Sequence, residues 1–245
     1  MQDRSSKIRS LFSAALIAVS AATFASAQES PGHKQNVRPD AAVPVAATPP
    51  SASSEKTARY SYEFAQPRFY IRHIVIEHDS SGHGKITFER LNEETPIIED
   101  LEISPTAFAR ISGLWQALRF LDSETSYQSE KQFPHLGVVK LAMVEGERRR
   151  TAEFNWSHVK EASDLATEYR RIADQASFVF DINVARENQP LNAPKLMESF
   201  ESMLRRNALS DPQQVIPLLK EISTDERIPL IARNHALRLL NKIKK

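Results

Sequence analysis

The sequence predicts an α+β fold, with an antiparallel sheet of about five strands packed by two helices and followed by a small all-α C-terminal segment. Apolar residues that alternate with polar ones in residues 69–103 and 138–156 indicate strands separated by turns. Apolar residues spaced three and four apart after Ser104 and after Ser157 indicate two amphipathic helices. Residues 191–245 carry three helical patterns and no strand-like alternation, so we expect them to be helical.

The predicted strands are joined by short turns. Ordered structure is expected to begin where apolar and polar residues alternate at 60–64, until Pro67 ends the pattern. Residues 79–84 (DSSGHG) supply turn formers and two glycines that can adopt positive φ, and residues 145–147 (EGE) form the turn of a second hairpin. The expected strands are 69–76, 85–91, 97–103, 138–144 and 148–156.

Two amphipathic helices are expected to cover the sheet. Ser104 is a suitable N-cap, and Pro105 fits the first helical position, where its missing N–H costs nothing. The second helix is expected to begin at about Ser157. The predicted apolar faces comprise Phe108, Ile111, Leu114, Trp115, Leu118 and Leu121 in the first helix, and Ala162, Leu165, Ala166, Tyr169, Ile172, Ala173, Ala176 and Phe180 in the second.

The C-terminal segment, residues 191–245, is expected to hold helices that begin at Pro194, at residues 210–212 and near Asp225. In the last helix, residues 225–229 (DERIP) and the apolar positions after them are similar to the inner helix of a HEAT-type repeat, a class of repeat that works as a binding surface. A solenoid needs about three or more stacked units, and only one helical pair is visible. We therefore favour a helical extension of the α+β domain, with a repeat module as the alternative.

The first 27 residues have the layout of a secretory signal peptide, with basic residues, an apolar stretch at 11–24 and small residues before the expected cleavage after Ala27. The apolar stretch is shorter than the roughly 20 residues that span a bilayer, so cleavage is favoured over an uncleaved anchor. The chain has no cysteine, which excludes a lipoprotein signal and disulfides. We expect a periplasmic or secreted protein without stable membrane insertion after cleavage.

Residues 28–57 contain five prolines and no aromatic residue, which predicts a disordered Pro/Ala linker. The α+β domain is then expected at 58–187 and the helical, HEAT-like segment at 191–245. The formal net charge of the chain is +1, so the composition suggests no nucleic acid as a partner.

The order of elements in residues 68–187 resembles an exported bacterial domain family of unknown function. The resemblance rests on a hairpin, a helix that is capped by Ser104 and Pro105 and ends in residues 118–122 (LRFLD), a loop, a hairpin led by Gly137 and a closing helix. It implies an α+β fold of hairpin, helix, hairpin and helix, and it brings no activity with it.

No motif in the sequence predicts a catalytic, cofactor or metal site. The G-x-S-x-G, P-loop, dinucleotide-binding and HExxH patterns are all missing, so no cofactor is expected. A weak alternative is a metal site at the tip of the first hairpin formed by His78, Asp79 and His83, although solvated turn residues are the favoured interpretation. The acidic run at 99–102 is interpreted as a solvated strand face rather than an acid–base pair.

The connection at 123–135 is long for a compact domain, and such loops often bind a ligand. The candidate binding residues are therefore the loop side chains and two residues at the end of the sheet: Tyr127, Phe133, His135, Asn155 and Trp156. The favoured alternative is that Phe133 and Leu136 only fix the loop to the core.

We expect the protein to be a non-catalytic binding or scaffolding module of the bacterial cell envelope, with another envelope protein as its partner. This prediction rests on the missing catalytic motifs, the helical C-terminal segment and the aromatic loop. The alternative is a periplasmic enzyme of unrecognised, hydrolytic type that uses His135 or the hairpin histidines. A pocket that gathers His135, a carboxylate and Asn155 would favour the enzyme.

Overall fold

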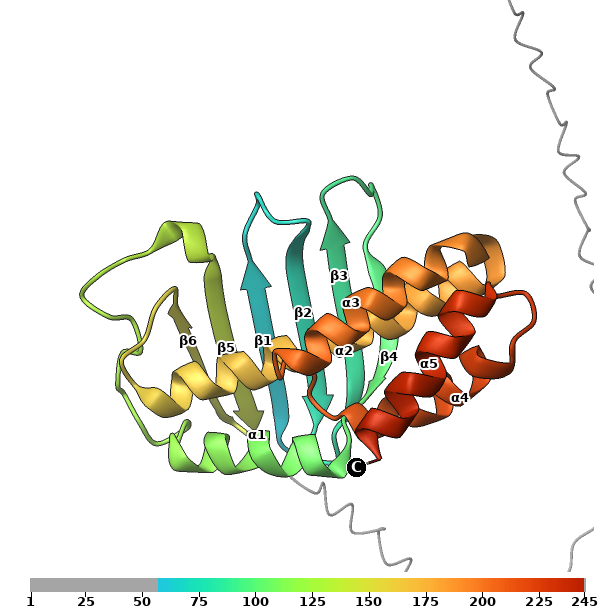
Figure 1. The fold of residues 1–245 in the computed structure, drawn as a ribbon. Coiled ribbons are helices and arrows are strands. Elements are labelled where there is room, and N and C mark those ends of the chain that lie inside the picture. The colour runs from blue at the N-terminus through green and yellow to red at the C-terminus, as the bar shows by residue number, and fades with distance from the viewer. Residues whose placement is uncertain (1–56, 245) are drawn as a thin grey trace, which may run out of the picture. The chain divides into compact units, whose positions relative to one another are not determined.

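The computed structural model describes residues 57–244. The predicted signal peptide and, apart from Thr57, the predicted linker lie outside the described residues. The six strands of the described chain form one antiparallel sheet in the order β4-β3-β2-β1-β5-β6 (Figure 1). Their bounds are Arg59–Ala65 for β1, Ile71–Asp79 for β2, His83–Arg90 for β3, Ile97–Glu102 for β4, Val138–Glu145 for β5 and Arg148–Phe154 for β6.

The α+β fold is confirmed, with six strands instead of about five. The additional strand is β1, which the sequence shows only as a short alternation before Pro67. In the structure β1 pairs with β2 on one side and with β5 on the other, so it lies at the centre of the sheet. Neighbours distant in sequence stabilise this strand, which explains why local alternation indicated it only weakly.

Two helices cover one face of the sheet, α1 (Pro105–Ala117) and α2 (Lys160–Asn188) (Figure 1). The start of α1 is as predicted, because the Ser104 hydroxyl accepts a hydrogen bond from Ala107 N and Pro105 follows the cap. The end of α1 differs, since the helix stops at Ala117 and Arg119 adopts a φ of 44°. Leu121 therefore lies beyond the helix, not on its apolar face.

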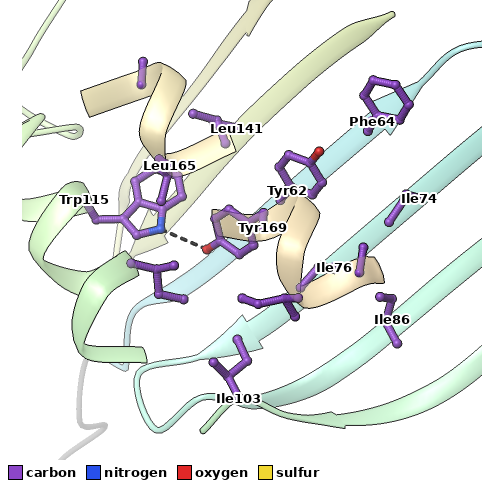
Figure 2. Close-up of a cluster of buried hydrophobic side chains, with 14 of the residues drawn as sticks. Tyr62, Phe64, Ile74, Ile76, Ile86, Ile103, Trp115, Leu141, Leu165 and Tyr169 are labelled. Carbon is purple, nitrogen blue, oxygen red and sulfur yellow. Dashed lines mark hydrogen bonds between the residues drawn. The ribbon is translucent and has the colours of Figure 1, made fainter. Parts of the chain in front are cut away.

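The main core lies between the sheet and these two helices (Figure 2). Tyr62, Ile76 and Ile86 are cross-strand neighbours on the covered face, and each is at most 1% exposed. Trp115 from α1 and Tyr169 from α2 meet them from the helical layer. Alternation in the strands and the three-to-four spacing in the helices thus direct apolar side chains into one layer.

The remaining helices are α3 (Ala193–Arg205), α4 (Ile216–Thr224) and α5 (Leu230–Ile243). They share a second apolar core with the C-terminal half of α2, through Phe178 and Ile182. Two helix starts differ from expectation. Residues 212–215 form a 3-10 turn before α4. The last helix, α5, begins at Leu230, five residues after Asp225. The Asp225 carboxylate accepts a hydrogen bond from the backbone N–H of Arg227 ahead of the helix, and Pro229 is the residue directly before it.

Candidate functional site

The loop between α1 and β5 fixes one of the predicted binding residues inside the protein. Tyr127 is 3% exposed and packs against Phe120 and Phe154. Its hydroxyl accepts a hydrogen bond from Arg150, whose guanidinium also donates to the Phe120 carbonyl. Tyr127 is therefore a core residue and does not join an exposed aromatic surface.

Asn155 holds this loop beside the end of β6. Its side-chain oxygen accepts hydrogen bonds from Phe133 N at 3.2 Å and from Gln128 Nε2 at 3.1 Å. Asn155 N donates in turn to Gln128 Oε1, and Ser129 N donates to the Trp156 carbonyl. These bonds fix the loop to the sheet. Leu136, which was expected to help attach the loop to the core, is instead 39% exposed.

The other three predicted binding residues come together. The Phe133 ring lies 5.7 Å from that of Trp156 and 6.1 Å from that of His135, both in edge-on geometry. Trp156 is 44% exposed. None of these residues lines the cleft described below, and the Asn155 side-chain oxygen is bonded to the loop.

Of the three hairpin residues proposed as metal ligands, His78 points into the core, away from Asp79 and His83 at the turn. His78 is buried, and its ring nitrogens bond to the Tyr169 hydroxyl and the Asp79 carbonyl. Asp79 and His83 are joined through the Ser81 hydroxyl at the turn. Within residues 57–244 no group of three or more His, Asp or Glu side chains could hold a metal ion.

The contacts around Ser81 resemble a serine triad in composition but not in connectivity. In a triad, histidine lies between the serine and the carboxylate and takes the serine proton. Here the Ser81 hydroxyl lies between Asp79 and His83 and donates to Asp79 Oδ1. These hydrogen bonds hold the pKa of Asp79 below its usual value and stabilise the turn. They do not activate Ser81 as a nucleophile.

A cleft of about 600 Å³ lies between β4, α2 and α4. This volume is within the range of natural ligand sites, roughly 300–1,000 Å³. Its apolar walls come from these three elements, from Ile86 of β3, from Ile103 after β4 and from Val215 before α4. They comprise Ile86, Leu101, Ile103, Ile172, Ala176, Val179, Phe180, Val184, Val215, Pro217 and Leu218.

Every charged residue that lines this cleft is acidic. Three belong to the edge strand and two to the helices: Glu99, Asp100, Glu102, Glu187 and Glu221. Arg186 pairs with Glu221 at 2.9 Å, whereas within residues 57–244 the three carboxylates of β4 have no ion-pair partner. A cleft with apolar walls and unpaired carboxylates attracts ligands that are both apolar and cationic.

The sequence shows the acidic run at 99–102 but does not show that it lines a cleft. Glu99, Asp100 and Glu102 are exposed, as the interpretation of a solvated strand expects, but Glu99 forms a cross-strand pair with the buried Ile86, so its side chain lies on the helix side of the sheet. The one available signal was the register: Ile97, Glu99 and Leu101 share a strand face, so a carboxylate interrupts an otherwise apolar set.

No helix within residues 57–244 is long and apolar enough to cross a membrane. Neither a scan against models of protein families nor a search of curated proteins found a match to this chain.

Proposed function

We propose that the chain is an exported bacterial envelope protein that acts as a non-catalytic binding module, and that its cleft receives a basic and apolar segment of a partner protein. The observation that carries this proposal is the lining of the cleft, where apolar walls meet five carboxylates and no basic side chain. The layout of residues 1–27 as a signal peptide supports the envelope location. The resemblance of residues 68–187 to an exported domain family also supports that location, and the similarity of the last helix to a HEAT-type repeat agrees with a binding role.

The partner's chemistry follows from the energetics of the cleft. Apolar ligand side chains gain free energy when they leave water, by about 25 cal/mol per Å² buried. Lysine or arginine side chains beside the unpaired carboxylates add charge complementarity, which mainly improves specificity and the association rate. An acidic segment would be repelled, and a polar basic segment would lose the apolar contribution.

The test uses the chain without residues 1–27 and three fluorescent peptides of about nine residues. The first alternates lysine with valine, the second replaces lysine with glutamate, and the third replaces valine with serine. We expect the lysine–valine peptide to bind at least tenfold more tightly than the other two, with affinity that falls as salt rises. Equal binding of the three peptides would overturn the proposal.

Two matched variants locate the binding. Val184 lines the cleft and is 40% exposed, whereas Leu237 is 47% exposed on α5 and is not among the residues that line the cleft. Val184→Asn should weaken binding of the lysine–valine peptide, because it replaces an apolar contact with a polar one and adds no charge. Leu237→Asn should leave that binding unchanged. Unchanged binding to Val184→Asn would show that the cleft is not the site.

The envelope location has its own test. Mass spectrometry of the protein purified from its native host should show Gln28 as the first residue. An intact Met1 in the mature protein would contradict export with cleavage.

A further inference from the structure

The two edge strands of the sheet, β6 and β4, have different surroundings. At the β6 end, the loop before β5 lies alongside, and Arg150 Nη2 donates to the Thr125 carbonyl at 2.6 Å while Ser129 N donates to the Trp156 carbonyl at 2.9 Å. Edge strands commonly need such a cover, because their free N–H and C=O groups can pair with another chain. At the other end of the sheet, β4 is the last strand (Figure 1). Residues of β4 line the cleft.

The backbone register shows which groups of β4 point away from the sheet. In an antiparallel pair, successive residues direct their N–H and C=O groups alternately toward and away from the neighbouring strand. Ile103 N donates to the Gly82 carbonyl at 3.0 Å, so Glu99 and Leu101 also bond toward β3. The N–H and C=O groups of Ile98, Asp100 and Glu102 therefore point away from β3.

Only one of these outward groups has a protein partner within residues 57–244. The Glu102 carbonyl accepts a hydrogen bond from Gln214 Nε2 at 2.7 Å. That bond confirms the outward direction of the Glu102 carbonyl. It leaves five outward groups available: the N–H and C=O groups of Ile98 and Asp100 and the N–H of Glu102.

The cleft runs along this free edge. Five consecutive residues, Glu99–Ile103, line it, although alternate residues of the strand face opposite sides of the sheet. A cavity that touches both faces must border the edge between them. The α2 side chains Val179, Phe180 and Val184 form part of the apolar lining.

We propose that the partner segment binds as an additional β-strand along β4, a mode that rests on the binding function proposed above. Its backbone pairs with the free groups of Ile98 and Asp100, as in other strand-addition complexes. Its side chains on the helix side contact the apolar wall, and those on the opposite side lie beside Asp100 and Glu102. The segment is therefore an amphipathic strand in which apolar residues alternate with lysine or arginine.

The decisive variant is Asp100→Pro, with Asp100→Asn as its matched control. Proline removes the outward N–H of residue 100 and leaves the hydrogen bonds between β3 and β4 intact, since edge strands tolerate proline at such positions. Asparagine removes the charge and keeps the N–H. With the lysine–valine peptide as probe, we expect Asp100→Pro to lose at least tenfold in affinity and Asp100→Asn only about twofold.

A second measurement tests the same hydrogen bonds on the unmodified protein. The lysine–valine peptide is methylated on alternate backbone nitrogens, in the two possible phases. One phase should lose binding at least tenfold and the other should bind nearly as the parent does, because only alternate residues of an added strand bond to β4. This comparison remains valid if Asp100→Pro does not fold.

The outcomes separate this inference from the proposed function. Full binding by a folded Asp100→Pro variant, or equal effects of both methylation phases, would overturn strand addition. If Val184→Asn still lost binding in that case, the cleft would remain the site and the ligand would occupy it in another conformation. If Val184→Asn also bound normally, the proposed function would fail as well.

Discussion

Glu99 of β4 is the cross-strand partner of Ile86 of β3, and the two side chains emerge from the same face of the sheet. Ile86 is fully buried beneath the helices, whereas Glu99 is exposed in the cleft. The helical cover therefore ends between adjacent strands. A ligand at this boundary contacts the apolar layer and the carboxylates at once, which is the property on which both proposals depend.

The two histidines of β2 should titrate on opposite sides of their ordinary pKa of 6.5. Partial burial lowers the pKa of His73, but hydrogen bonds to Glu63 and Glu89 outweigh it and raise the pKa. Burial lowers the pKa of His78, against an opposing hydrogen bond to the Asp79 carbonyl. Ring chemical shifts followed by NMR from pH 4 to 9 would measure both values, with His73→Gln and His78→Gln for assignment.

These shifts have opposite effects on stability. A raised pKa in the folded state means that His73 stabilises the protein below pH 6.5 and that this contribution disappears as pH rises through its folded pKa. A lowered pKa means that His78 costs stability as pH falls below 6.5. His73→Gln should therefore lower the free energy of unfolding at pH 5.5 by about 0.5 kcal/mol and have less effect at pH 8.5. A loss that is larger at pH 8.5 would contradict the assignment.

Removing the Tyr169 hydroxyl should destabilise the protein by about 2 kcal/mol. Trp115 Nε1 donates to this oxygen at 2.9 Å (Figure 2). His78 Nε2 lies 2.7 Å from the same oxygen. Because His78 Nδ1 faces the Asp79 carbonyl and must donate, the Tyr169 hydroxyl donates to the neutral His78 Nε2. Tyr169→Phe leaves both partners buried without a hydrogen bond.

Tyr60→Phe is the control for this variant. Tyr60 stacks on His78, and within residues 57–244 its hydroxyl has no hydrogen-bond partner. Chemical denaturation of both variants should show a large loss for Tyr169→Phe and a loss below about 0.5 kcal/mol for Tyr60→Phe. Similar losses would mean that aromatic packing, rather than the hydroxyl, stabilises this part of the core.

Two glycine-to-alanine changes should have opposite effects. A Cβ on Gly84 would overlap the Glu77 carbonyl oxygen across the β2–β3 hairpin, so Gly84→Ala should cost on the order of 3 kcal/mol or prevent folding. Gly113 is exposed in α1 and has open space around the position of a Cβ. Gly113→Ala should raise the free energy of unfolding by about 0.5–1 kcal/mol, because alanine favours helix more than glycine does. Thermal melts of both variants would check the two directions.

The sequence predicted the sheet and the two covering helices because apolar residues repeat every second position in the strands and every three to four positions in the helices. The Ser104-Pro105 cap and the turn at 145–147, where Gly146 has a φ of 61°, depend on neighbouring residues only. The sequence could have shown that His78 is a core residue rather than a candidate metal ligand. His78 continues the inward alternation of Ile74 and Ile76, so its side chain belongs to the core. Tyr127 offered no such signal, because it lies in a loop whose contacts come from β6 and residues after it.

The sequence by itself determined the types and order of most elements in residues 57–244, since local periodicity, caps and turns act over a few residues. Only the tertiary structure decided that β4 is a free edge and that its carboxylates face a cleft. That cleft joins residue 99 to residues 187 and 221, which are far apart in the chain. A local sequence pattern does not show which distant elements pack against each other. This site could therefore be recognised only in the folded protein.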